Sequence, residues 1–124
     1  MPRVLVIEDA VFTLRVLEEQ LRLAGFEVLK AMDGEEGIKM AKEHCPDAII
    51  CDIMLPRADG YAVLREIRAY EPMATVPFIF LTAKATRQDI RKGFALTADD
   101  YLVKPVSGRV LIAALHKQLK SSPE

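Results

Sequence analysis

Short apolar runs that alternate with amphipathic segments constrain the fold of this chain more than any other feature. Five runs of strand length occupy residues 3–7, 26–31, 48–51, 78–81 and 101–103. In the segment after the first run, apolar side chains recur on one helical face at Leu14, Leu17, Leu21 and Ala24. Strands that alternate with helices predict a parallel sheet covered on both faces, and continuous apolar runs suit such burial. We therefore predict an α/β fold with a five-stranded, doubly wound parallel sheet of flavodoxin-like order 2-1-3-4-5.

Turn-forming residues mark the ends of the predicted helices. Gly25 ends the first helix, because glycine adopts a left-handed backbone at least cost. Asp33-Gly34 is a turn before a second helix that runs through about residue 42, and a Pro- and Gly-containing loop at 56–60 precedes a third over 61–70. A fourth helix should begin near Thr86, and a fifth should cover 107–119. We expect residues 1–120 to form one domain and residues 121–124 to be a tail or the start of a linker.

Composition narrows the possible functions. With 17 basic and 18 acidic residues among 124, the net charge is −1, which predicts no direct binding to nucleic acid or to a membrane surface. Hydrophobic residues make up 51%, too many for a disordered chain, and no apolar run approaches the length of a membrane span. The spacing of Cys45 and Cys51 favours reduced thiols over a disulfide framework or a zinc site, and we expect a cytoplasmic protein.

Polar residues follow four of the predicted strands at the points where those strands end. They are Glu8-Asp9, Asp52, Thr82-Ala83 and Lys104-Pro105. Because the carboxyl ends of parallel strands meet at one crevice, three carboxylates, a hydroxyl and an ammonium should share one pocket. Crowded carboxylates repel one another, and Mg²⁺, which prefers oxygen ligands and retains water, relieves that repulsion. Any one of these residues could be an ordinary cap or turn residue, but four at one sheet edge predict a site.

The predicted pocket suits phosphoryl transfer. A carboxylate such as Asp52 can act as a nucleophile toward phosphorus and give an acyl phosphate. Such transfer mainly requires positioning and charge neutralisation, for which Mg²⁺, Lys104 and the Thr82 hydroxyl are suitable.

Four motifs in this pattern resemble the receiver domain of two-component response regulators. The family has an acidic pair after strand one, an aspartate after strand three, a Thr or Ser after strand four and Lys-Pro after strand five. The corresponding segments here are VLVIEDA, IICDIMLPRADGY, FIFLTAKA and ADDYLVKP. Thirty residues separate Asp52 from Thr82 and twenty-two separate Thr82 from Lys104, spacings similar to those of the family. The resemblance covers essentially the whole chain.

The resemblance implies a role for each matching residue. Asp52 would be the phosphoacceptor, and the ligands of Mg²⁺ (or Mn²⁺) would be Glu8, Asp9, Asp52 and the backbone carbonyl of Met54. Thr82 and Lys104 would contact the phosphoryl oxygens. Tyr101 matches the aromatic switch position, and Lys104-Pro105 matches a peptide bond that is usually cis.

The chain departs from the family pattern at several positions. Glu8 replaces the commoner Asp but keeps its charge, and Val106 stands where Phe is frequent. Thr97 stands where the family usually has Gly, so we expect a strained left-handed backbone there. Val110 and Ala114 replace the charged pattern of the large DNA-binding subfamily, which argues against a dimer built on that subfamily's salt bridges.

Two other classes of function are alternatives to a receiver switch, and a degenerate receiver is a third. An aspartyl-phosphate hydrolase would resemble D-x-D, but Asp52 is followed by Ile53 and Met54, so we expect no turnover of small substrates. A flavin-binding module would require a phosphate loop after strand one, where Glu8-Asp9 would repel phosphate. A degenerate receiver that serves only for docking would have lost Asp52 or Lys104.

The predicted function is a phosphorylation switch that interacts with a protein that donates the phosphoryl group and with a partner that responds to it. The donor would be a phosphohistidine on a sensor histidine kinase or a histidine phosphotransfer protein. Phe12 should face outward beside the pocket mouth, where it would either anchor that donor or merely cover the adjacent helix. The output would be a downstream protein partner or a missing effector domain, and it would read the surface formed by helix four, strand five and helix five. Movement of Thr82 and Tyr101 would change that surface on phosphorylation.

Overall fold

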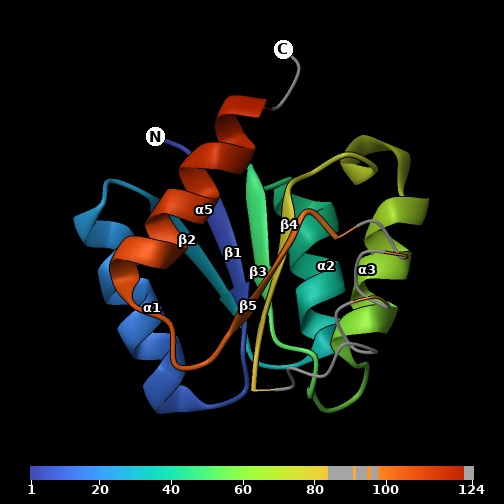
Figure 1. The fold of residues 1–124 in the computed structure, drawn as a ribbon. Coiled ribbons are helices and arrows are strands. Elements are labelled where there is room, and N and C mark those ends of the chain that lie inside the picture. The colour runs from blue at the N-terminus through green and yellow to red at the C-terminus, as the bar shows by residue number, and fades with distance from the viewer. Residues whose placement is uncertain (84–90, 92–94, 96–97, 122–124) are drawn as a thin grey trace.

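The computed structural model describes residues 1–83, 91, 95 and 98–121 and consists of a parallel sheet between two layers of helices (Figure 1). Five strands lie in the order β2-β1-β3-β4-β5, and every neighbouring pair is parallel. Their bounds are β1 Arg3–Ile7, β2 Glu27–Ala31, β3 Ala48–Cys51, β4 Phe78–Thr82 and β5 Asp100–Val103. The predicted five-stranded, doubly wound sheet and its strand order are therefore confirmed.

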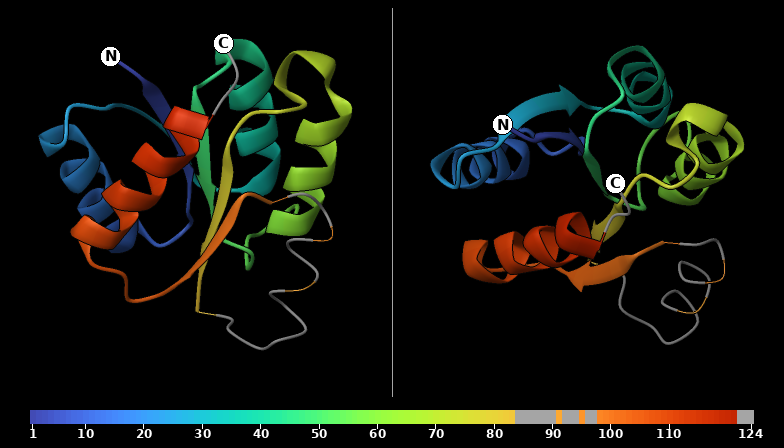
Figure 2. Two further views of the ribbon diagram at one scale, coloured as in Figure 1. Left: turned by 45° about the horizontal axis from the view of Figure 1, so that its top comes forward. Right: turned by 90° about the horizontal axis from the view of Figure 1, so that it is seen from above.

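The helices cover both faces of the sheet. They are α1 Val11–Leu23, α2 Gly34–His44, α3 Gly60–Ala69 and α5 Gly108–Ser121, with a short 3₁₀ helix at Glu71–Met73. Helices α1 and α5 pack on one face, and α2 and α3 pack on the other (Figures 1 and 2). The helix predicted near Thr86 and the strain predicted at Thr97 lie outside the described residues. Among the described residues, no helix is both long enough and apolar enough to cross a membrane.

Two hydrophobic layers form the core, one on each face of the sheet. Alternate side chains of one strand enter different layers, so that Leu5 and Ile7 face α2 and α3 while Val4 and Val6 face α1 and α5. The central strands β1, β3 and β4 are buried almost throughout, which explains their continuous apolar sequences. The edge strands β2 and β5 are partly exposed and carry charged residues.

The ends of the first and last helices differ from the prediction. Leu14, Leu17 and Leu21 are buried as predicted, but Ala24 is exposed and follows the last turn of α1. Gly25 has φ 93°, so the chain leaves the helical path there, and Phe26 takes the buried place instead. At the other end of the chain, α5 ends at Ser121, two residues beyond the predicted end of the last helix.

Candidate phosphoryl-transfer site

Backbone hydrogen bonds hold three of the predicted site residues at one edge of the sheet. The amides of Glu8, Asp52 and Lys104, each the first residue after its strand, continue the strand pairing. Glu8 N donates to the Ala31 carbonyl at 3.0 Å, and Asp52 N donates to the Ile7 carbonyl at 3.0 Å. Lys104 N donates to the carbonyl of Thr82, the last residue of β4, at 2.9 Å. The ends of β1, β3, β4 and β5 therefore meet at one edge, as the sequence predicts.

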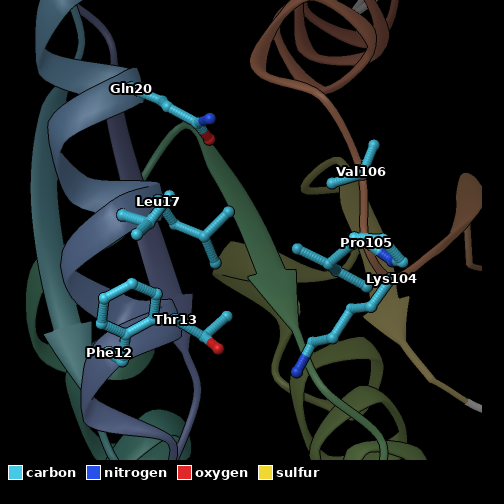
Figure 3. A pocket seen from close by; sticks show the side chains of 9 residues that line it. Phe12, Thr13, Leu17, Gln20, Lys104, Pro105 and Val106 are labelled. Atoms are coloured by element: carbon cyan, nitrogen blue, oxygen red, sulfur yellow. The ribbon is translucent and has the colours of Figure 1, made fainter.

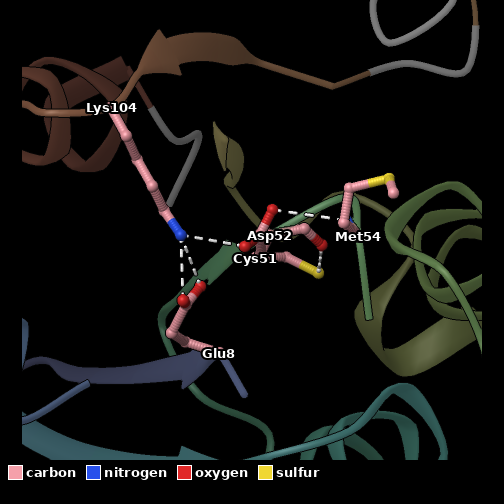
Figure 4. Close-up of polar contacts among 5 residues, drawn as sticks. All are labelled: Glu8, Cys51, Asp52, Met54 and Lys104. Carbon is pink, nitrogen blue, oxygen red and sulfur yellow. Dashed lines mark hydrogen bonds and ion pairs between the residues drawn. The ribbon is translucent and has the colours of Figure 1, made fainter. Parts of the chain in front are cut away.

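The Lys104 ammonium lies between the carboxylates of Glu8 and Asp52 (Figure 4). Its Nζ donates to Glu8 Oε1 at 2.9 Å and Oε2 at 3.0 Å, and to Asp52 Oδ2 at 2.9 Å. The other Asp52 oxygen, Oδ1, accepts a hydrogen bond from the Met54 amide at 3.3 Å. The sequence predicts that Lys104 and the carboxylates share one pocket, but it does not predict that Lys104 contacts both oxygens of Glu8.

Close packing beneath the site fixes the position of Asp52. Gly60, the first residue of α3, lies so near the end of β3 that an added Cβ would collide with the Asp52 carbonyl oxygen. The same Cβ would lie 2.8 Å from the Ile53 Cα. Only glycine fits at this position without moving the loop that carries Asp52.

The site combines deep burial with charge. Glu8 is 2% exposed, Asp52 is 7% exposed, and the Thr82 side chain is fully buried. Asp9, by contrast, is exposed, and Met54 is 62% exposed. Buried charged groups are stable only when they are paired, and the contacts of Lys104 supply that pairing.

The pKa values of the three charged residues are shifted by burial and by their mutual contacts. Burial raises the pKa of Glu8 to about 7, against the opposing effect of Lys104. For Asp52, burial raises the pKa, but the hydrogen bonds with Lys104 and Glu8 outweigh it and leave the pKa below its usual value. Burial lowers the pKa of Lys104, but its two carboxylate partners outweigh that effect and raise it. Of these two carboxyl groups, Asp52 therefore loses its proton first as the pH rises, as suits a nucleophile.

The acidic residues at this edge form a set that fits a hard divalent cation. Glu8, Asp9 and Asp52 each offer a carboxylate oxygen, and these oxygens lie within 4.8 Å of one another. Mg²⁺ prefers such oxygen ligands and keeps part of its water shell. The exposure of Asp9 leaves one side of the set open to solvent, where retained water would lie. The donor set therefore fits the predicted cation.

Thr82 and Tyr101 lie on the neighbouring strands β4 and β5. In their register, Thr82 is opposite Val103 and Phe80 is opposite Tyr101. The Tyr101 ring is partly buried, and its centroid lies 5.9 Å from that of Phe80 at an interplanar angle of 62°. Tyr101 therefore lies on the strand next to Thr82, two positions away from it in the register.

Two further predictions concern features beside the site, a peptide bond and an exposed aromatic residue. The Lys104–Pro105 peptide bond is cis, the isomer that the resemblance implied. Phe12, in the first turn of α1, is 80% exposed. It lines one end of a groove between α1 and residues 104–106, which reaches Lys104 (Figure 3). Phe12 is exposed, as predicted, whereas no pattern in the sequence indicates the groove.

Comparison with known proteins agrees with this geometry. The sequence profile of the "Response regulator receiver domain" family matches residues 4–116. The chain is 42% identical over 120 residues to transcriptional regulatory protein AfsQ1 of Streptomyces coelicolor, covering 97% of this chain and 52% of that protein. It is 43% identical over 119 residues to transcriptional regulatory protein PrrA of Mycobacterium tuberculosis, covering 96% of this chain and 50% of that one. The chain thus spans about half the length of these relatives.

Solved structures show the same fold. A putative response regulator from Chloroflexus aurantiacus is 34% identical, with a TM-score of 0.92 over 96% of this chain and 98% of that one. The receiver domain of sensor histidine kinase PA1611 from Pseudomonas aeruginosa is 36% identical, with a TM-score of 0.91 over 97% of this chain and 98% of that one. That structure holds a magnesium ion in its active-site cleft. The chain belongs to the family of response regulator receiver domains, the signal-receiving domains of two-component systems.

Proposed function

We propose that this chain is a Mg²⁺-dependent switch that accepts a phosphoryl group on Asp52 from a phosphohistidine of a sensor kinase or a phosphotransfer protein. The observation that carries the proposal is the placement of Asp52. It is a buried, ionised carboxylate with a lysine ammonium 2.9 Å from one oxygen and two further acidic side chains beside it. A purely structural ion pair would not require this third, exposed carboxylate.

The proposed chemistry is a transfer between two nucleophiles. An Asp52 carboxylate oxygen forms a bond to phosphorus as the phosphorus–nitrogen bond of the phosphohistidine breaks, and the electron pair of that bond returns to the imidazole. Lys104 already lies against Asp52 and neutralises part of the charge that gathers on the phosphoryl oxygens. The Thr82 hydroxyl, at the end of the adjacent strand, is the second proposed contact of those oxygens.

Glu8, Asp9 and Asp52 are the residues that would hold Mg²⁺ or Mn²⁺, together with the backbone carbonyl of Met54. When bound, the cation would neutralise charge on the carboxylates and on the phosphoryl group. Lys104 contacts two of these carboxylates in the described structure, so the ammonium and the cation would bind two of the same side chains. Lysine therefore stabilises the site in the absence of the cation.

The first test is labelling with a small phosphodonor. Acetyl phosphate and Mg²⁺ should give a single acyl phosphate on Asp52, located by mass spectrometry of the intact chain and its peptides. The Asp52→Asn variant should not be labelled. Asp47→Asn is a matched control, because Asp47 lies just before the same strand at its opposite end and binds the Arg3 amide. Equal labelling of the Asp52→Asn protein would refute the assignment.

Phe12 is the proposed contact of the donor protein. Its ring is 80% exposed next to the groove that leads to Lys104, and large exposed aromatic side chains are typical anchors of interfaces. Phe12→Ala should slow transfer from a phosphohistidine protein far more than it slows labelling by acetyl phosphate. Equal loss in both assays would indicate a folding defect instead.

The proposed output begins with the phosphoryl group, whose charge of about −1.5 to −2 gives Thr82 a new partner. Movement of Thr82 would open space that Tyr101 can enter, and the surface of β5, α5 and the segment of the predicted fourth helix would change. That segment lies outside the described residues. Thr82→Ala should still accept the phosphoryl group, but its affinity for a partner should no longer depend on it. The relatives are transcriptional regulators about twice as long, so we propose that the output is a downstream protein or an effector domain.

A further inference from the structure

The loop between β3 and α3, residues 52–59, is held from two sides. At its end, the amide of Gly60, the first residue of α3, donates to the Ile53 carbonyl at 2.8 Å. In its middle, the amide of Gly34, the first residue of α2, donates to the Pro56 carbonyl at 3.2 Å. Helix α2 contributes none of the proposed metal ligands or phosphoryl contacts, but it supports the loop that carries two of those ligands.

The hydrogen bond between Gly34 and Pro56 also completes the start of α2. The first amides of a helix have no partner within the helix. The Asp33 side chain accepts from the amide of Glu36 at 2.7 Å, and the Pro56 carbonyl accepts from that of Gly34. Gly34 is buried, so a loop that moved away would leave a buried amide without its acceptor. Loop and helix therefore hold each other in place.

Close packing accompanies this hydrogen bond. An added Cβ at Gly34 would collide with the Ala58 carbonyl oxygen and would lie 2.7 Å from the Ala58 Cβ. The obstacle is the backbone of the loop, so a methyl group at this position must displace the loop or the helix. At Gly37, one turn later, an added Cβ would instead lie 2.5 Å from Cδ1 of Ile7, a side chain of β1. The two glycines thus separate contact with the loop from contact with the sheet.

We propose that Gly34 is a positioning residue for the divalent cation, because its contacts with the loop fix the peptide of Met54. Met54 lies between the two supported carbonyls, those of Ile53 and Pro56, and its amide donates to Asp52 Oδ1 at 3.3 Å (Figure 4). The Met54 side chain is 62% exposed, so its own packing does not fix this peptide. The inference rests on the proposed function, in which the Met54 carbonyl and the nearby carboxylates bind Mg²⁺.

The size of the effect follows from the distance between Gly34 and the cation. Gly34 would act through the loop and not as a ligand. Groups that orient metal ligands typically change metal affinity by about 10- to 100-fold, and we expect the lower end for a contact two residues from Met54. Linkage requires the reverse effect as well, so that bound Mg²⁺ stabilises the contact between the loop and α2 by the same factor.

A Mg²⁺ titration of two variants tests the proposal. Backbone amide chemical shifts in NMR follow binding to the full chain, without phosphorylation. Gly34→Ala should raise the Mg²⁺ dissociation constant about tenfold. Gly37→Ala is the matched control, since the same methyl group on the same helix meets the sheet instead of the loop. It should lower the free energy of unfolding but leave the dissociation constant unchanged. Equal dissociation constants for Gly34→Ala and wild type, or equal weakening in both variants, would overturn the proposal.

Hydrogen exchange in the wild-type chain gives a second test that does not depend on the folding of Gly34→Ala. The Gly34 amide is bonded to the loop, whereas the Gly37 amide donates to the Asp33 carbonyl at 3.0 Å. Mg²⁺ should slow exchange of the Gly34 amide more than that of the Gly37 amide, and equal slowing would overturn the proposal. Failure of the proposed function is a different result, in which Mg²⁺ does not bind the wild-type chain. Failure of this inference leaves Mg²⁺ bound with the same affinity by wild type and Gly34→Ala.

Discussion

Replacement of Lys104 by methionine separates the stabilising role of this residue from its chemical role. Methionine keeps most of the apolar stem but removes the ammonium that contacts Glu8 and Asp52 at 2.9 Å. Removal of one partner of a buried ion pair costs about 3–5 kcal/mol. The Lys104 side chain is 22% exposed, and the carboxylates can take up a proton, so we expect a smaller loss of about 2 kcal/mol at pH 8 without Mg²⁺.

The loss should depend on pH with a definite sign. Without the ammonium, the pKa of Glu8, already raised to about 7, should rise further, so the folded state retains a proton that the unfolded state releases. The free energy of unfolding of the variant should therefore fall as the pH rises through this range, and the loss at pH 5 should be below about 1 kcal/mol.

Urea unfolding followed by circular dichroism, at pH 5 and pH 8, with EDTA or Mg²⁺, measures these effects. Mg²⁺ at ten times its dissociation constant should restore about 1.4 kcal/mol to the Lys104→Met variant. Wild type should gain less at the same Mg²⁺ concentration, because its lysine competes for the oxygens. Lys39→Met is the control, since that side chain is 74% exposed and pairs only weakly with Glu43 at 4.0 Å. The reasoning fails if the two variants are equally stable at pH 8 in EDTA, or if the loss is the same at both pH values.

Three further substitutions test other parts of the structure. Because the pKa of buried Glu8 is raised from 4.5 to about 7, the free energy of unfolding of the wild type without metal should fall by up to about 3 kcal/mol as the pH rises through that range. Glu8→Gln should abolish this pH dependence, which urea unfolding at several pH values measures. Arg57 has a left-handed backbone with φ 71°, a conformation that costs a residue other than glycine about 1 kcal/mol. Arg57→Gly should therefore raise the melting temperature, because the weak contact with Asp33 at 3.8 Å contributes little. An unchanged melting temperature would contradict this. Gly60→Ala should slow labelling of Asp52 by acetyl phosphate, because the added methyl group displaces the loop after β3; a labelling rate equal to wild type would show that the loop accommodates it.

The positions of the site residues could be predicted from the sequence because two simple rules apply. Apolar runs of four or five residues predict strands, and the edge rule for parallel sheets brings the residues after those strands together. Glu8, Asp52 and Lys104 lie at that edge because their amides continue the strand pairing. The same rules fail at Ala24, since a helical period does not show where the helix stops. The left-handed Gly25 ends the helix, and Phe26 fills the core instead.

Contacts between the side chains at this edge join residues far apart in the sequence, so no short-range sequence pattern predicts them. Lys104 and Glu8 are 96 residues apart, and the sequence predicts both in the pocket without predicting their ion pair. That ion pair explains how a buried glutamate is tolerated next to a second carboxylate in the absence of a cation. The groove could not be predicted for the same reason, because residues from α1, β4 and the segment after β5 line it. Gln20 has the sequence position of an ordinary polar residue of an amphipathic helix, but packing buries its carbonyl oxygen, which has no hydrogen-bond partner within the described part of the chain. A sequence therefore identifies where chemistry can occur on such a sheet, whereas the burial and pairing of single side chains depend on how distant elements pack together.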